Sequence, residues 1–119
     1  MSTDTTSEAS NETPDEPIHI DGRADLDEVV ATHEIVLTDF YADWCGPCKM
    51  LEPVVETLAA QTDVAVAKID VDANQQLAAT YGVRGVPTLI LFVDGKQVEE
   101  VVGMQNESQL RSLIGRYAE

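Results

Sequence analysis

Cys45 and Cys48 are the only cysteines of this 119-residue chain, and Gly46 and Pro47 separate them. They lie between an apolar run and a helical pattern, so both thiols fall at a helix N-terminus, where backbone N–H groups and the helix dipole stabilise a thiolate. Pro47 fixes φ early in the helix and stiffens the small disulfide ring that the two thiols can close. The pair predicts dithiol redox chemistry. Cys45, exposed in the loop, would be the nucleophile, and the more buried Cys48 would resolve a mixed disulfide.

A metal site is the main alternative for the same pair. Zinc takes four ligands, and the chain has no second cysteine pair. His19 and His33 are too far apart in sequence to act as the close pair of a zinc finger. Haem attachment would need a histidine where Lys49 stands. Redox chemistry without a metal or a bound organic cofactor is therefore favoured, and a zinc or iron–sulfur site that bridges a dimer stays open.

The charge balance narrows the classes of partner. Lys plus Arg number 7 and Asp plus Glu number 22, which gives a formal charge of −15. Nucleic acid and anionic membranes are poor partners for such a chain, because both need clustered cations. Its apolar runs fall far short of the roughly 18 residues that span a bilayer, and residues 1–17 lack the basic and apolar regions of a secretory signal. We expect a cytoplasmic protein.

The carboxylates themselves suggest adaptation to very high salt, where screening suppresses self-repulsion. We therefore expect the free energy of unfolding to fall when KCl is lowered from several molar to near zero, as denaturant titrations at both salt concentrations would measure. Undiminished stability at low salt would contradict this. The rival explanation is an acidic surface that meets a basic partner, and a steep loss of coupling to such a partner with rising salt would favour it.

Two regions are expected along the chain. Residues 1–16 are rich in acidic and small polar residues without a basic one, which predicts a disordered tail. Residues 17–119 are expected to form one domain. In it, strands are expected over 18–20, 35–41, 64–70, 88–93 and 96–102, and helices from 25, over 47–60, over 74–81 and after 106. The alternation predicts an α/β fold with a mixed central sheet, in which parallel strands and an antiparallel C-terminal hairpin are flanked by helices on both faces.

Local signals mark the ends and the buried faces of these elements. Asp25 and Asn106 are expected to cap the first and last helices, and Asp94-Gly95 is typical of a tight hairpin turn. Pro53 is expected to kink the second helix. The apolar faces expected in the core are Met50, Val54 and Leu58 on the second helix and Leu110, Leu113 and Ile114 on the last.

Asp39 interrupts the apolar strand at 35–41. A carboxylate among such residues is costly to bury unless it is paired or protonated. One interpretation is a solvated strand end. The functional interpretation is a buried acid with a raised pKa, which accepts a proton from Cys48 through water when the mixed disulfide is resolved.

Three segments resemble the signatures of the thioredoxin family. They are 39–49 (DFYADWCGPCK), 82–88 (GVRGVPT) and Gly103, and the resemblance runs from about residue 18 to 118. Tyr41 departs from the tryptophan that the family often has there, but it keeps an aromatic ring. The resemblance implies the thioredoxin fold and the reduction of protein disulfides. Gly46-Pro47 resembles the pair in reducing members, whereas oxidases and isomerases of this fold more often carry histidine there.

The resemblance also implies roles for residues outside the cysteine pair. Lys68 matches the family's partner lysine and would tune the pKa of Asp39, with a surface salt bridge as the alternative. The Val86–Pro87 bond would be cis and face the cysteines, with the backbone of Val86 free to pair with substrate. An apolar docking face would be formed by Trp44, Gly46, Pro47, Val86, Pro87, Gly103 and Met104.

The expected protein is thus a monomeric protein-disulfide reductase. Its partners would be disulfide-containing proteins and a thioredoxin reductase that regenerates the dithiol. A binding or scaffold subunit of the same fold, in which redox activity is incidental, is the alternative from a different functional class.

Overall fold

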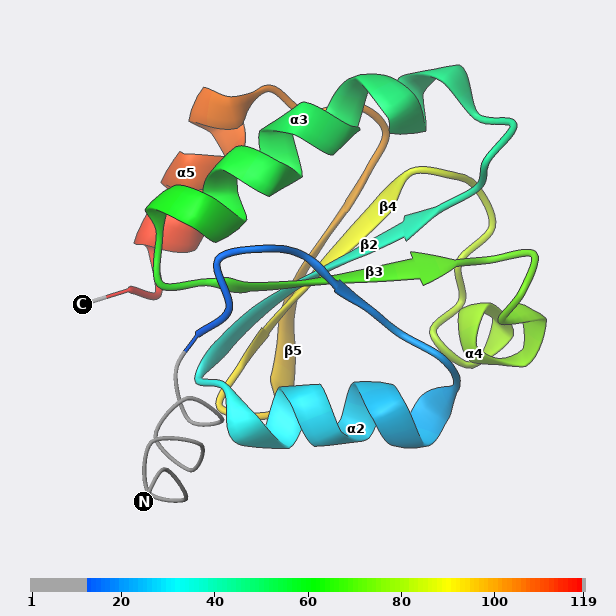
Figure 1. Cartoon of the computed structure of the whole chain (residues 1–119), viewed down its shortest axis with the longest axis horizontal. Coiled ribbons are helices and arrows are strands. Elements are labelled where there is room, and N and C mark those ends of the chain that lie inside the picture. Colours follow the sequence, from blue (N-terminus) through cyan, green and yellow to red (C-terminus); the bar gives the residue numbers. More distant parts are fainter. Residues whose placement is uncertain (1–12, 119) are drawn as a thin grey trace, which may run out of the picture.

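The structure, a computed structural model of the chain, describes residues 13–118. A mixed five-stranded sheet forms its centre, with strand order β1-β3-β2-β4-β5 (Figure 1). β3 pairs in parallel with β1 and β2, whereas β4 is antiparallel to both β2 and β5. The strands are β1 (Ile18–His19), β2 (Ile35–Tyr41), β3 (Ala65–Asp70), β4 (Thr88–Val93) and β5 (Lys96–Val102). The mixed sheet with its C-terminal hairpin confirms the predicted fold class.

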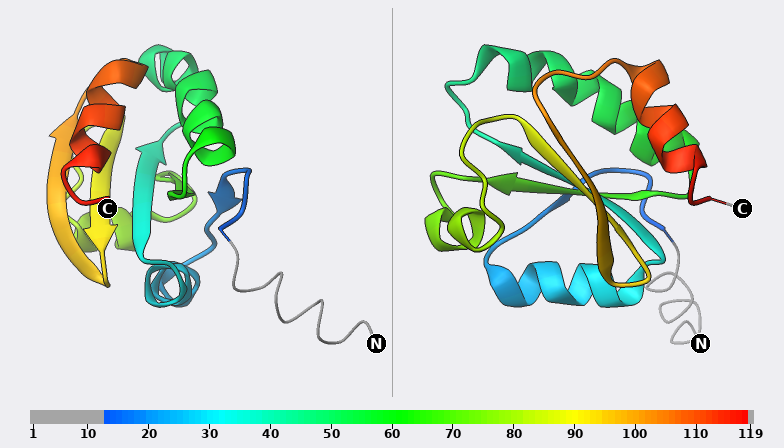
Figure 2. Two further views of the ribbon diagram at one scale, coloured as in Figure 1. Left: turned by 90° about the vertical axis from the view of Figure 1, so that its left-hand side faces the viewer. Right: turned by 180° about the vertical axis from the view of Figure 1, so that it is seen from behind.

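Helices cover both faces of this sheet. α3 (Gly46–Gln61) and α5 (Glu107–Gly115) pack on one face, and α2 (Arg23–Thr32) and α4 (Gln75–Thr80) lie on the other side (Figure 2). Side chains alternate along β2, so Ile35 and Leu37 join the core beneath α3 while Val36 and Phe40 join the core over α2. By the same alternation Asp39 and Tyr41 belong to the α3 face.

The predicted capping was right for the last helix and wrong for the first. Asn106 and Gln109 form a reciprocal capping box at the start of α5. α2 begins earlier than expected, after Gly22, which has a φ of +89° and no side-chain cap. Asp25 lies inside the first turn of α2, where its carboxylate accepts the N–H of Asp21. The helix dipole favours an acidic residue in the first turn as well as at the N-cap. The aspartate alone therefore could not show at which residue α2 begins.

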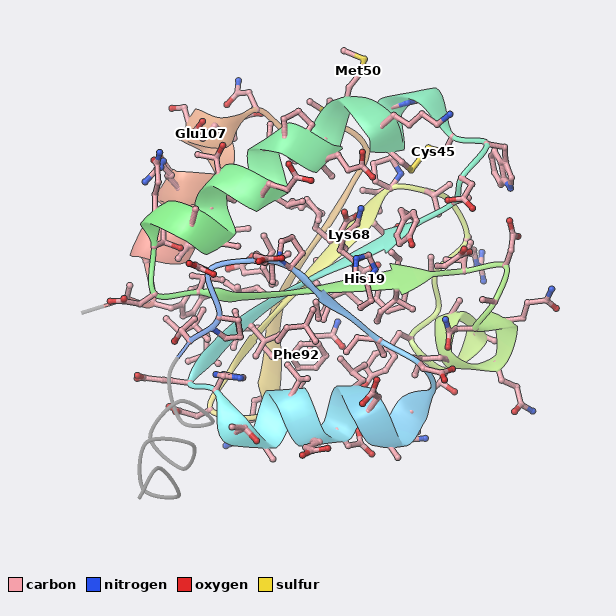
Figure 3. The ribbon with its side chains drawn as sticks, in the orientation of Figure 1. His19, Cys45, Met50, Lys68, Phe92 and Glu107 are labelled. Atoms are coloured by element: carbon pink, nitrogen blue, oxygen red, sulfur yellow. A yellow bond between two sulfur atoms is a disulfide. The ribbon has the colours of Figure 1, made fainter. Side chains whose placement is uncertain are left out.

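The prediction that Met50 belongs to the core was wrong. Its side chain is 66% exposed and projects from the outer side of α3 (Figure 3). The buried face of α3 is instead formed by Cys48, Leu51, Val55, Leu58 and Ala59, with Val54 partly buried at its border. The helix remains continuous across Pro53.

The predicted acidic tail lies largely outside the described residues, since only 13–16 of it are described. The boundary between tail and domain therefore stays a prediction. In the described residues, no helix combines the length and the apolar character needed to cross a membrane.

Candidate functional site

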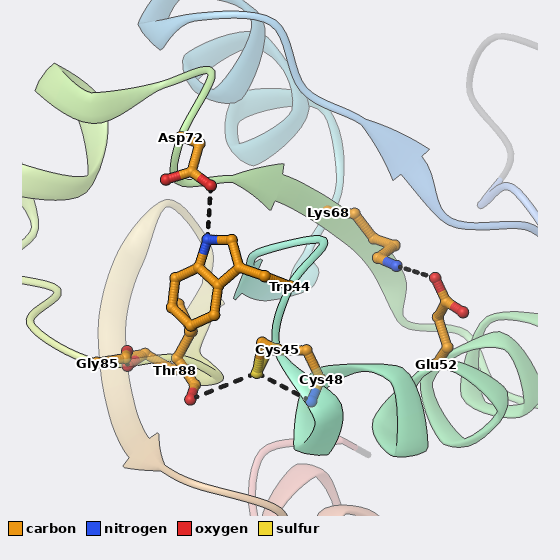
Figure 4. The surroundings of a disulfide bond; sticks show 9 residues. Trp44, Cys45, Cys48, Glu52, Lys68, Asp72, Gly85 and Thr88 are labelled. Carbon is orange, nitrogen blue, oxygen red and sulfur yellow. Dashed lines mark hydrogen bonds and ion pairs between the residues drawn. A yellow bond between two sulfur atoms is a disulfide. The ribbon is translucent and has the colours of Figure 1, made fainter.

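The cysteine pair lies at the start of α3, just after the short loop that follows β2. Cys45 is the N-cap of α3 in an extended conformation, and a disulfide joins it to Cys48 with the two Cα atoms 5.3 Å apart. The N–H of Cys48 donates to Sγ of Cys45 at 3.2 Å (Figure 4). This bond uses one of the N–H groups that a helix leaves without a partner in its first turn. The same group can stabilise a thiolate on Cys45 once the disulfide is reduced.

Cys45 was predicted to be exposed, and in the disulfide form it is not. Cys45 is 4% exposed and Cys48 3%. Both pack with Ala42 in a small cluster, against which Tyr41 and Val86 are placed. Exposure therefore does not distinguish the two cysteines in the disulfide form, whereas their positions do, because Cys45 is the N-cap of α3 and Cys48 lies inside its first turn.

The loop before β4 approaches the disulfide from the opposite side. The Val86–Pro87 bond is cis, as expected, and the carbonyl oxygen of Val86 lies 3.7 Å from Sγ of Cys45. A disulfide sulfur carries no proton, so this is a contact here, which the thiol of the reduced protein can turn into a hydrogen bond. The N–H of Gly103 donates to the carbonyl of Pro87 at 2.8 Å, which brings the end of β5 to the same place.

The residues of the predicted docking face meet around this loop with unequal exposure. Trp44 is 70% exposed, and its indole N–H donates to Asp72 at 2.9 Å (Figure 4). Gly46 and Pro47 are exposed and Met104 is 39% exposed, whereas Pro87 is buried. Beside Val86 lies a pocket of about 140 Å³, lined by Trp44, Val71, Val83, Arg84, Gly85 and Val86. Asp72, which fixes the indole, was not anticipated from the sequence.

Asp39 is fully buried on the α3 face of β2, the strand that precedes the cysteine pair, and neither of its carboxyl oxygens has a hydrogen-bond partner among the described residues. Burial raises its pKa from 3.8 to about 6, the charge of Lys68 opposes this rise, and the charge of Glu52 adds to it. The solvated strand end considered from the sequence is therefore excluded.

Lys68 lies beside Asp39, because β2 and β3 pair these two residues in register. It is 5% exposed, and its ammonium makes an ion pair with Glu52 on α3 at 3.2 Å (Figure 4). The ammonium also lies 4.3 Å from the centre of the Tyr41 ring. Glu52 was missed in the sequence, although it follows Cys48 by four residues and so shares its side of the helix.

Between residues 13 and 118 no group of three or more His, Cys, Asp or Glu side chains is arranged to hold a metal ion.

Comparisons with known proteins agree with this geometry. The family model described as Thioredoxin matches residues 18–116. Thioredoxin of Chlamydia muridarum is 51% identical over 84 residues, which are 70% of this chain and 82% of the relative. Thioredoxin of Mycobacterium tuberculosis is 47% identical over 85 residues, 70% of this chain and 73% of the relative.

Solved structures of thioredoxins are also similar to this chain. A mutant thioredoxin from Halobacterium salinarum is 67% identical with a TM-score of 0.88, covering 90% of this chain and 95% of that one. Thioredoxin of Schistosoma mansoni is 30% identical with a TM-score of 0.80, covering 89% and 99%. With its cysteine pair at the N-terminus of α3, the chain belongs to the thioredoxin family of protein-disulfide oxidoreductases.

Proposed function

We propose that this protein-disulfide reductase works by attack of the Cys45 thiolate on a substrate disulfide. One substrate sulfur leaves with the electron pair of its S–S bond, and Cys45 and the other sulfur form a mixed disulfide. Cys48 then attacks Cys45, which releases the second substrate thiol and closes the Cys45–Cys48 disulfide. The observation that carries this order is the hydrogen bond from the Cys48 N–H to Sγ of Cys45, because it favours negative charge on Cys45.

Asp39 is proposed to accept the proton of Cys48 during the second step, through water. A buried carboxyl with a pKa of about 6 titrates close to neutral pH, which is where a general base works best. Lys68 is proposed to tune this pKa, since its positive charge lies on the neighbouring strand at the same register.

Substrate is proposed to dock across the cis-proline loop. The exposed indole of Trp44 and the side chain of Met104 offer apolar contacts, and Gly46, Pro47 and Gly103 allow a close approach of backbone. Val86 and Pro87 lie between them, next to Cys45. Binding through backbone and a few apolar contacts suits many disulfide substrates.

The family implies a thioredoxin reductase that returns electrons to the Cys45–Cys48 disulfide. We propose that the protein works as a monomer in the cytoplasm. The large apolar side chains that are exposed in the described part are few, namely Trp44, Met50, Val102 and Met104, and this supports a monomer.

Reduction of an insulin-like protein disulfide by dithiothreitol, in several molar KCl, tests the proposal. The wild-type protein is expected to accelerate the reaction. A variant in which Cys45→Ser and Cys48→Ser are combined should leave the rate at that of dithiothreitol alone, because no mixed disulfide can form. Absence of acceleration by folded wild-type protein would overturn the proposal and favour a binding or scaffold subunit.

A further inference from the structure

Three charged side chains lie together on the α3 face of the sheet, and one of them, Glu52, follows Cys48 by one turn of α3. Asp39 and Lys68 face each other from adjacent strands, and Glu52 reaches them from α3. Asp39 and Lys68 are buried, whereas the Glu52 side chain is 49% exposed. The cluster therefore has one end closed in the core and one end open to solvent.

Two carboxylates, those of Asp39 and Glu52, lie near Lys68, and Lys68 forms an ion pair with Glu52. Its ammonium is 3.2 Å from Glu52 and makes no ion pair with Asp39, both of whose oxygens are without a partner among residues 13–118. A buried ammonium is costly without a counter-charge. Glu52 supplies that charge from the solvent side, and the Tyr41 ring holds the ammonium from a second side.

We infer that Glu52 is a positioning residue for the redox cycle, which holds the Lys68 ammonium at its own carboxylate and so keeps Lys68 from pairing with Asp39. The inference rests on the proposed role of Asp39 as the proton acceptor of Cys48. An ion pair with Lys68 would stabilise the ionised Asp39 and make it a weaker base. Glu52 thus leaves Asp39 able to take a proton near neutral pH.

The other groups around Asp39 leave this cluster as the main source of charge. Tyr41 lies on the same strand as Asp39, and Leu89 of β4 lies opposite Asp39. α3 contributes Glu52 and Cys48. Cys48 does not titrate while it is held in the disulfide. Among residues 13–118, the formal charges that act on Asp39 are those of Lys68 on β3 and Glu52 on α3.

Titration of the Asp39 carboxyl carbon by NMR, in the oxidised full-length protein, tests the inference. Glu52→Gln keeps the size of the side chain and removes its charge. It is expected to lower the Asp39 pKa by about one unit, the change that a new ion pair brings. Glu56→Gln, one turn further along α3 and exposed, removes the same charge and is the matched control. A Glu52→Gln shift no larger than that of Glu56→Gln would overturn the inference.

A second background separates positioning from a direct effect of the Glu52 charge. In Lys68→Met, whose side chain has similar length, Glu52→Gln is expected to shift the Asp39 pKa by less than half as much, because no ammonium remains to be released. Equal shifts in both backgrounds would overturn the positioning role.

These titrations need no turnover, so their result is independent of the proposed function. In the reduced protein, the pH profile of kcat/KM for a protein disulfide should move to lower pH in Glu52→Gln by the same amount as the titration. A moved titration with an unmoved profile would leave the positioning of Lys68 standing and overturn the proton-accepting role of Asp39.

Discussion

Cys48→Ser is expected to stop turnover and to accumulate a mixed disulfide between Cys45 and the substrate. Serine keeps the backbone N–H that donates to Sγ of Cys45, so the thiolate that attacks is retained. The hydroxyl cannot displace a thiol from a disulfide, so the second step fails. The rate of protein-disulfide reduction should fall to that of dithiothreitol alone, while the first step survives.

Mass spectrometry of the intact protein, after mixing with a disulfide substrate and quenching with acid, checks this. The Cys48→Ser variant should gain the mass of one substrate thiol in nearly every molecule. Cys45→Ser is the matched control and should gain little, because Cys48 lies inside the helix and lacks the N-cap position. The reverse pattern would assign attack to Cys48 and contradict the proposed order.

Much of the fold follows from local patterns in the sequence. The β-branched and aromatic run at 35–41 predicted β2 with both of its ends, and Asp94-Gly95 predicted the hairpin turn, where φ is +52° and +84°. Asn106 predicted the start of α5, where the structure shows a capping box with Gln109. Each of these signals acts over a few residues, so no knowledge of distant contacts was needed.

The sequence predictions fail where contacts between residues distant in the sequence determine which side chains are buried or paired. Met50, Leu51, Val54 and Val55 are all apolar, and this stripe is wider than the face that the sheet and α5 cover. Periodicity alone could not tell which edge would stay outside. The pairing of Lys68 with Glu52 likewise depends on how α3 lies over β3, a relation that no local spacing encodes.

Asp39→Asn is expected to stabilise the protein above pH 6 and to have little effect on its pH-dependent stability near pH 3. The folded protein holds the pKa of Asp39 at about 6 against 3.8 in an unfolded chain. Between these values the folded state binds more protons than the unfolded state, so the contribution of Asp39 to stability falls as pH rises through this window and is lowest above it. The difference corresponds to about 3 kcal/mol. Lys68 keeps Glu52 as its counter-charge in the variant, so removing Asp39 strands no buried charge.

Urea unfolding of wild type and Asp39→Asn at pH 3.5 and pH 7.5 measures the effect. The difference in the free energy of unfolding between variant and wild type should grow by about 3 kcal/mol from the lower to the higher pH, and comparing the two pH values removes any constant cost of burying the amide. Asp43→Asn is the control, because it removes the same charge from an exposed residue. A gain of the same size for both variants would mean that relief of the overall negative charge, rather than burial of Asp39, stabilises the protein. Above pH 6, the higher free energy of unfolding of Asp39→Asn should be accompanied by slower release of the substrate thiol from the mixed disulfide. The reason is that the carboxylate that destabilises the fold is the proposed acceptor of the Cys48 proton.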